Sequence, residues 1–271
     1  MYSTNFCDNI CRRKIYCYFY KKLYNSELLN LNLFCISVRD KRVVVLTGAG
    51  VSAESGVKTF RGPDGLWENH SLDDVATPDA WIRDPQLVWD FYQARRNQLT
   101  QVEPNPAHLA LGLLQSEIPD FTLITQNVDD LHERGGSSSV LHMHGELRTL
   151  RCEVTGETEL RMTDSDLSQN FVNCNCCETP TKMRPDIVWF GEIPMFMQKI
   201  YQMVENCDIF IVIGSSGHVY PAAGLVGVAS TYGAHTILVN YDLPVNADMF
   251  DEVHTGKAGE LLPKLVTEWL D

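Results

Sequence analysis

The sequence predicts an α/β fold, in which a parallel β-sheet is covered by helices on both faces. Short and continuously apolar runs, which are typical of strands buried on both faces, alternate with longer segments of helical periodicity. The apolar runs are residues 43–46, 121–124, 209–213 and 236–239. The helical segments are residues 84–99, 106–115, 195–204 and 258–270. A chain of 271 residues, 44% of them hydrophobic, is long enough for one large domain that carries a smaller one.

The composition excludes several classes of partner. The formal net charge is -13, and a chain this acidic repels the phosphate backbone of nucleic acids. Basic, lysine-rich protein segments suit it better. No apolar run reaches the roughly 18–20 residues that a bilayer span requires, so no membrane association is expected. The nine cysteines cluster in a way that indicates metal binding in a reducing compartment and not a disulfide framework. We expect a cytoplasmic monomer.

Residues 1–40 differ in composition from the rest of the chain. They are rich in Tyr, Cys, Leu and Asn and nearly free of Gly and Pro. A signal peptide is a poor fit because no small-residue cleavage site follows a clean apolar core, and a transit peptide stays open although the segment is poor in Arg. We expect a dispensable N-terminal extension followed by a functional domain over residues 41–271.

The turn after the first predicted strand carries a Gly-x-Gly-x-x-Ala pattern, from Gly48 to Ala53. Such glycines permit a tight turn and close approach of the backbone to a pyrophosphate, which the next helix N-terminus attracts. A glycine-rich turn without a ligand is the alternative. A loop with Phe60, Arg61 and Trp67 then stands where an ordinary dehydrogenase has a helix and a second strand. The pattern predicts a dinucleotide site but not simple hydride transfer.

Further motifs follow this turn along the chain. Together with residues 48–56 and 59–61 they comprise residues 125–132, 144–147, 184–192 and 214–216. In this order the motifs resemble those of the sirtuin family, and the resemblance covers residues 42–271. The spacing, together with residues 218–223, is most similar to the bacterial CobB-type class III sirtuins.

The resemblance implies a Rossmann-like domain with a smaller inserted domain, which combines a helical part and a zinc-ribbon-like cysteine cluster. The large part would comprise residues 41–57, 103–147 and 186–271, and the small part residues 58–102 and 148–185. The implied activity is NAD-dependent deacylation of protein lysine (deacetylation and also desuccinylation or demalonylation), which yields nicotinamide, lysine and O-acyl-ADP-ribose. NAD-dependent mono-ADP-ribosylation of a protein on the same scaffold is the alternative.

The residues implied in NAD binding include a group at the end of a predicted strand. Gln126, Asn127 and Asp129 lie at its carboxyl edge, where open α/β sheets bind ligands, although Asn and Asp are also common turn residues. By the resemblance they hold the nicotinamide and its ribose. The full implied set is Gly48, Ala49, Gly50, Ser52, Ala53, Phe60, Arg61, Trp67, Gln126, Asn127, Val128, Asp129, Gly214, Ser215, Ser216, Asn240, Tyr241, Asp242 and Ala258.

Two histidines, His142 and His144, compete for the role of catalytic base. They lie two residues apart on an expected strand, so both side chains point to the same face. A structural role is the alternative for a lone histidine on a strand. The resemblance selects His144, which directly precedes a glycine, and histidine suits the task because its ordinary pKa of about 6.5 lies near working pH.

The resemblance also implies an acyl-lysine site. Val188, Phe190, Gly191 and Glu192 would border the peptide groove. The acyl pocket would contain Ala76 and a Tyr-x-x-Arg pair, Tyr92 and Arg95, which binds the carboxylate of succinyl- or malonyl-lysine in class III sirtuins. Tyr92 and Arg95 are three residues apart and share one face of a helix. A surface arginine that only extends toward solvent is the alternative.

The cysteine cluster departs from a complete zinc site of two Cys-x-x-Cys pairs. Cys152 is followed three residues later by Thr155, which cannot replace a thiolate, and the second half contains Cys174, Cys176 and Cys177. We expect one structural zinc ion held by these four cysteines, with Cys176 as a possible substitute for the missing ligand. A metal-free cluster of reduced thiols is the alternative.

Overall fold

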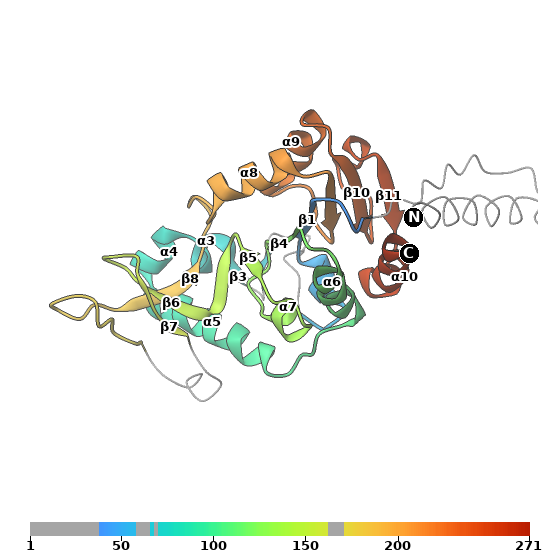
Figure 1. Cartoon of the computed structure of the whole chain (residues 1–271). Helices are drawn as coiled ribbons and strands as arrows, with labels where there is room; N and C mark the ends of the chain where they lie inside the picture. Colours follow the sequence, from blue (N-terminus) through green and yellow to red (C-terminus); the bar gives the residue numbers. More distant parts are fainter. Residues whose placement is uncertain (1–37, 58–65, 68–69, 162–170) are drawn as a thin grey trace, which may run out of the picture. The chain divides into compact units, whose positions relative to one another are not determined.

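The computed structural model describes residues 38–57, 66–67, 70–161 and 171–271 of the chain. In this part, six parallel strands form the main sheet, in the order β11-β10-β9-β1-β4-β5 (Figure 1). Their bounds are β1 Val43–Thr47, β4 Phe121–Thr125, β5 Val140–His142, β9 Ile209–Ile213, β10 His235–Asn240 and β11 Glu252–Thr255. The predicted α/β class is confirmed.

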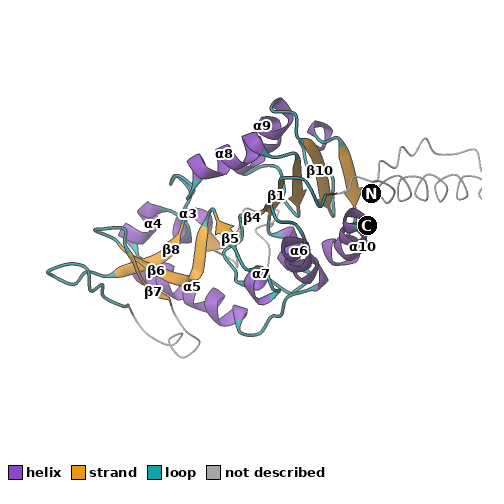
Figure 2. Ribbon diagram, in the orientation of Figure 1, coloured by secondary structure: helices purple, strands orange, loops and turns teal. Residues whose placement is uncertain are grey.

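The central strands alternate their side chains between two hydrophobic clusters. Val43 and Val45 belong to one cluster with helices α6 (Pro106–Glu117) and α10 (Ala258–Leu270). Val44 and Leu46 belong to another cluster with helices α8 (Met197–Asn206) and α9 (Leu225–Thr231). Because successive residues of a strand point to opposite faces, the two helix pairs cover opposite faces of the sheet (Figure 2).

The four apolar runs found in the sequence correspond to β1, β4, β9 and β10. The edge strand β5 ends at His142, in the segment where sequence analysis expected a strand, whereas sequence analysis missed β11 at the opposite edge of the sheet. The residues of β11 are half-buried or exposed, so this strand has no continuous apolar run. An edge strand needs fewer apolar residues because only one neighbour covers it.

A second, antiparallel sheet has the order β7-β6-β8 and packs with a group of helices. Its strands are β6 (Gly145–Cys152), β7 (Thr158–Arg161) and β8 (Met183–Ile187). The helices are α3 (Leu72–Val75), α4 (Pro78–Arg83) and α5 (Pro85–Leu99), and α5 begins where the Asp84 side chain accepts the Leu87 N–H. This smaller unit carries the cysteine cluster, as predicted, while its predicted boundaries stay a prediction.

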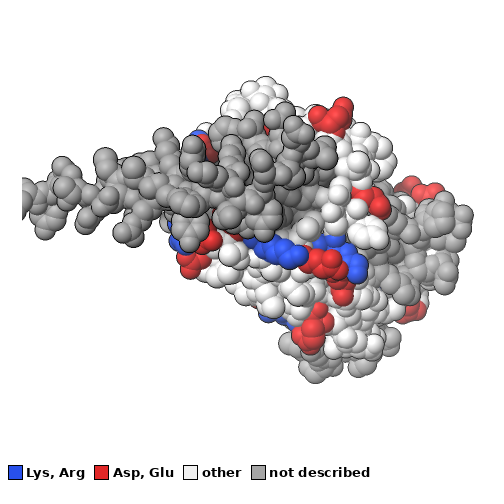
Figure 3. Space-filling view, turned by 90° about the vertical axis from the view of Figure 1, so that its right-hand side faces the viewer, with Lys and Arg blue, Asp and Glu red and all other residues white. Residues whose placement is uncertain are grey.

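The remaining short elements lie in the connections between the longer helices and strands. They are α2 (Gly50–Ala53), β2 (Leu66–Trp67), β3 (His70–Ser71), α7 (Leu131–Arg134) and the 3₁₀ turns Ala222–Gly224 and Ala247–Met249. Within the described ranges, no helix combines the length and the apolar character needed to cross a membrane. On the face shown in Figure 3, the coloured Lys and Arg side chains lie beside Asp and Glu side chains and form no broad basic surface.

Candidate active site

A cavity of about 560 Å³ lies at the carboxyl ends of β1, β4, β9 and β10. Ligands of open α/β sheets bind at this edge. Every residue that sequence analysis assigned to NAD, to the acyl-lysine substrate or to the base lines this cavity, apart from Phe60, Arg61 and Trp67. Phe60 and Arg61 lie outside the described residues, as does the side chain of Trp67. Segments that are far apart in the sequence therefore meet in one cavity.

The glycine pattern after β1 has a packing function in addition to any role with a ligand. A Cβ atom at Gly48 would lie 2.7 Å from the carbonyl oxygen of Gly214, and a Cβ atom at Gly50 would lie 2.8 Å from the same oxygen. The Gly50 N–H also donates to that oxygen at 2.8 Å. The two loops approach so closely that only glycine fits at these positions.

A buried polar network lies behind the Asn127 side chain. Asn127 Nδ2 donates to Ser52 Oγ at 3.1 Å, and His108 Nε2 lies 3.4 Å from the same oxygen. The Asn105 N–H donates to His108 Nδ1, so the ring proton of a neutral His108 is on Nε2. Burial lowers the pKa of His108 to about 4 and raises the pKa of Asp129. Sequence analysis missed His108, because the sequence pattern places it on the apolar face of α6 and gives no further sign of a polar role.

Hydrogen bonds also join the loops that follow β4, β9 and β10. Gln126 Nε2 donates to Ser215 Oγ at 3.1 Å, and Asn240 Nδ2 donates to the Ser215 carbonyl oxygen at 3.0 Å. Lys257, directly before α10, also lines the cavity, and its Nζ lies 3.5 Å from Glu260 Oε1. Sequence analysis missed Lys257 as well, although an anionic ligand of an acidic protein needs a local cation.

The two histidines have different environments. The expectation that both histidines lie on one strand is wrong for His144, which lies in the turn between β5 and β6. His144 lines the cavity, and its Nδ1 lies 3.1 Å from the Gln126 carbonyl oxygen. Burial lowers the pKa of His144. His142 ends β5, with Nδ1 3.1 Å from the Asn127 carbonyl oxygen and Nε2 2.8 Å from Glu133. Both ring nitrogens of His142 thus contact acceptors inside the protein, which leaves His144 as the candidate base.

The Tyr-x-x-Arg pair lies in the cavity wall. Tyr92 and Arg95 are 0% and 7% exposed, so Arg95 is not a surface arginine that extends toward solvent. Ala76 is also buried and lines the cavity with them. The Trp189 Nε1–H donates to the Tyr92 hydroxyl oxygen at 3.0 Å. A buried guanidinium beside a phenol can bind a carboxylate through charge-assisted hydrogen bonds.

Glu192, which we expected in the peptide groove, directs its carboxylate into the protein. It accepts hydrogen bonds from Arg184 at 2.7 Å and 2.9 Å and from the Trp189 backbone N–H at 2.8 Å. Arg151 adds a further contact at 3.2 Å. These bonds lower the pKa of Glu192, although burial opposes them as the largest single influence. Glu192 borders the cavity, but its charge is neutralised by two arginines.

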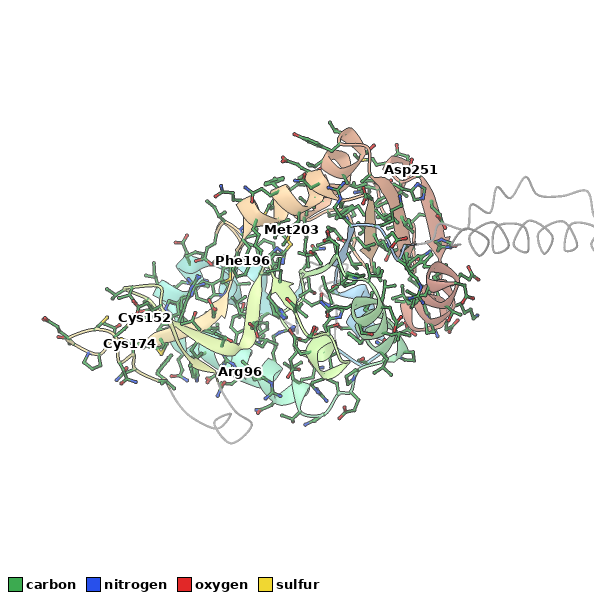
Figure 4. All side chains as sticks on the ribbon, viewed as in Figure 1. Arg96, Cys152, Cys174, Phe196, Met203 and Asp251 are labelled. Carbon is green, nitrogen blue, oxygen red and sulfur yellow. The ribbon has the colours of Figure 1, made fainter. Side chains whose placement is uncertain are left out.

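The four predicted cysteine ligands come together in the smaller unit. Figure 4 shows two of them, Cys152 and Cys174, close to each other beside the antiparallel sheet. The Sγ atoms of Cys152, Cys174, Cys176 and Cys177 all lie within 4.8 Å of one another. Cys177 Sγ is 3.7 Å from Cys152 Sγ and 3.8 Å from Cys176 Sγ. Tetrahedral zinc with bonds of about 2.3 Å to sulfur separates its thiolates by about 3.8 Å. The residues therefore fit a structural zinc ion, with Cys176 included in the set.

Thr155 lies at the position where a complete zinc site would have its second cysteine. Its hydroxyl lies 3.2 Å from Cys176 Sγ, so it contacts the thiol that completes the group of four. A hydroxyl is a poor zinc ligand beside thiolates, whereas it is a suitable hydrogen-bond donor to one.

Comparison with known proteins agrees with this geometry. The chain matches the model of the Sir2 family over residues 48–221. An NAD-dependent protein deacylase of Vibrio vulnificus (strain YJ016) is 52% identical over 233 residues, which cover 85% of this chain and 94% of that protein. A Sir2 homologue solved in complex with NAD has a TM-score of 0.78 at 35% identity and covers 91% of this chain and 96% of its own.

A mutant Sir2 homologue in complex with 2′-O-acetyl ADP ribose has the same TM-score of 0.78 at 37% identity, over 89% of this chain and 96% of the homologue. The resemblance that the motifs predicted is confirmed. This chain belongs to the Sir2 family.

Proposed function

We propose that this chain is an NAD-dependent protein-lysine deacylase that removes acetyl groups and also succinyl and malonyl groups. The observation that carries this function is the position of His144, whose ring lies in the same cavity as the glycine turn and as Asn127 and Asp129. A neutral base, a dinucleotide cradle and a buried arginine in one cavity suit transfer of an acyl group to a ribose hydroxyl.

NAD, as the co-substrate, would supply the electrophilic ribose carbon and the hydroxyl groups that receive the acyl group. The turn from Gly48 to Ala53 would hold the pyrophosphate, and Asn127 and Asp129 the nicotinamide ribose. His144 would accept a proton from a ribose hydroxyl at Nε2, because its Nδ1 proton is held by the Gln126 carbonyl oxygen. One water molecule would be consumed, and nicotinamide, lysine and O-acyl-ADP-ribose would be released.

The acyl end of the substrate would enter the pocket of Ala76, Tyr92 and Arg95. The guanidinium of Arg95 would pair with a terminal carboxylate, and Tyr92 would donate a hydrogen bond to it. The small side chain of Ala76 leaves room for a chain longer than acetyl. The net charge of -13 suits acyl-lysine segments that are rich in other basic residues.

Zinc would have a structural function, because four thiolates complete its coordination and leave no open position for a substrate. It would hold together the two segments that carry Cys152 and Cys174 to Cys177, which the antiparallel sheet brings into contact. The described cysteines are free thiols, which suits a reducing compartment such as the cytoplasm.

Incubation of the purified protein with NAD and matched acetyl-, succinyl- and malonyl-lysine peptides tests this function. Mass spectrometry should detect O-acyl-ADP-ribose and the deacylated peptide. ADP-ribose attached to protein, without loss of the acyl group, would instead identify a mono-ADP-ribosyltransferase. Formation of neither product with any of the three peptides would contradict both functions.

A further inference from the structure

The indole of Trp189 and the phenol of Tyr92 form a buried hydrogen bond between residues 97 positions apart. Trp189 Nε1 lies 3.0 Å from the Tyr92 hydroxyl oxygen. Trp189 is 2% exposed and Tyr92 is 0% exposed, yet both line the cavity. The bond is therefore shielded from bulk water and adjoins the pocket that would take the acyl group.

The chemistry of the two groups sets the direction of this bond. An indole N–H only donates, so the Tyr92 oxygen accepts and keeps its own proton for another acceptor. Burial raises the pKa of Tyr92 to about 12, which keeps the phenol protonated at neutral pH. With one side of the oxygen engaged by Trp189, rotation of the hydroxyl proton is restricted.

Contacts with three residues hold the indole in position. The guanidinium of Arg184 lies over the Trp189 ring, with its central carbon 3.3 Å from the ring centroid. Glu192 accepts the Trp189 backbone N–H and also binds Arg184. The Trp81 ring packs against the indole at a centroid distance of 5.9 Å. These contacts explain why the Glu192 carboxylate is directed into the protein.

We propose that Trp189 is a positioning residue for acyl selectivity, whose N–H directs the Tyr92 proton toward the carboxylate of a succinyl or malonyl chain beside Arg95. This inference rests on the proposed function and adds to it a residue outside the Tyr-x-x-Arg pair. A carboxylate that enters the buried pocket loses its hydrogen bonds to water. It must regain them from donors that are already oriented toward it. An acetyl group brings no charge, so it gains little from the oriented phenol.

The test is a double-mutant cycle on two peptides that differ only in the acyl group. Trp189→Phe should lower the succinyl-to-acetyl ratio of kcat/KM by about 3- to 10-fold, as expected for one neutral hydrogen bond, mainly through KM for the succinyl peptide. In the Tyr92→Phe background the same substitution should not change the ratio, because the hydroxyl that it orients is absent. Trp269→Phe, at a buried tryptophan of α10 that does not line the cavity, is the control and should leave the ratio unchanged.

A second variant separates the N–H from the shape of the ring. Replacement of Trp189 by 3-benzothienylalanine keeps the bicyclic ring and removes only the donor, and it should reproduce the ratio of Trp189→Phe. An equal loss for both peptides, or independent effects of Trp189→Phe and Tyr92→Phe, would overturn the inference. A wild-type protein that processes acetyl-lysine but not succinyl-lysine would overturn it too.

The hydrogen bond can be examined without catalysis. The indole N–H resonance of Trp189, assigned by its loss in Trp189→Phe, should shift in Tyr92→Phe and on addition of a succinyl-lysine peptide, but less with the acetyl peptide. If this resonance responds as expected while no peptide is deacylated, the proposed function fails and the positioning of Tyr92 stands. If deacylation occurs but the resonance does not shift in Tyr92→Phe, the inference about Trp189 fails and the proposed function stands.

Discussion

The Nδ1 atom of His144 lies 3.1 Å from the carbonyl oxygen of Gln126. A carbonyl oxygen only accepts hydrogen bonds, so Nδ1 carries the ring proton and Nε2 keeps a lone pair. Burial lowers the pKa of His144 below its ordinary value of 6.5, so the ring is neutral at pH 7. The same backbone contact thus selects the tautomer that a general base requires.

His144→Ala should lower kcat by about 100- to 10,000-fold, the range typical of a lost general base, and leave the fold intact by circular dichroism. Because the base acts only when deprotonated, kcat/KM of the wild type should fall as pH drops through a pKa below 6.5. A pH profile of kcat/KM checks both statements. An acidic limb centred above pH 6.5 would contradict the assignment, as would a larger loss in His142→Ala.

His142→Ala should be much milder in kcat. Burial favours the neutral form of His142, but the hydrogen bond and charge of Glu133 outweigh it and raise its pKa above 6.5. The stability from this pair is therefore fully present below pH 6.5 and is lost as pH rises through the raised pKa. Urea unfolding should find Glu133→Gln less stable than wild type by on the order of 1 kcal/mol at acidic pH. A difference that grows with pH would contradict this sign.

Metal analysis should find about one zinc ion per chain, and strong chelation should unfold or inactivate the protein. Cys152→Ser and Cys176→Ser should both reduce zinc content. Cys207→Ser is the control, because Cys207 is buried outside the cluster and contacts the Val204 carbonyl oxygen. Full activity with well under about half an equivalent of zinc would favour a cluster of reduced thiols.

Arg95→Met should weaken succinyl-lysine processing far more than acetyl-lysine processing. In this variant the succinyl carboxylate loses its charged partner in the buried pocket. The loss should lower kcat/KM for the succinyl peptide about 10- to 100-fold, because about 1.4 kcal/mol corresponds to a tenfold change. Tyr92→Phe should act in the same direction but less strongly.

Arg96→Met is the control for Arg95→Met. Arg96 is buried in the same helix, but it donates to the Leu147 carbonyl oxygen and to Gln93. Its loss should lower the melting temperature without changing the ratio of kcat/KM values for the two peptides. Equal losses for both peptides in Arg95→Met would make Arg95 a structural residue or one that positions NAD.

A chain that starts at Val38, the first residue that the structure describes, should keep full activity. A chain that starts at Lys41 should be less stable, because it lacks Val38 and Arg39. Val38 is 0% exposed in the main hydrophobic cluster, and Arg39 donates to the Leu270 carbonyl oxygen at 2.8 Å. Losing the Val38 side chain alone should cost about 1.5–3 kcal/mol in urea unfolding. Equal stability of the two chains would show that this segment is dispensable up to residue 40.

Several properties of this protein follow from the sequence by itself. Continuous apolar runs mark β1, β4, β9 and β10, because a strand buried on both faces needs apolar side chains at every position. The glycine turn predicts a dinucleotide cradle after β1, and the resemblance to sirtuins predicts that His144, which precedes Gly145, is the base. These signals depend on neighbouring residues in the sequence, so they can be read without knowledge of the tertiary packing.

Tertiary structure alone decided which of the local candidates meet and what their polar atoms contact. Cys176 joins the other thiols, Glu192 turns its carboxylate to Arg184, and Trp189 donates to Tyr92 across 97 residues. Nothing in periodicity or spacing distinguishes a carboxylate that faces a groove from one that faces a buried arginine. That choice depends on the desolvation and pairing of groups from distant segments, which are determined only when the antiparallel sheet packs against helix α5.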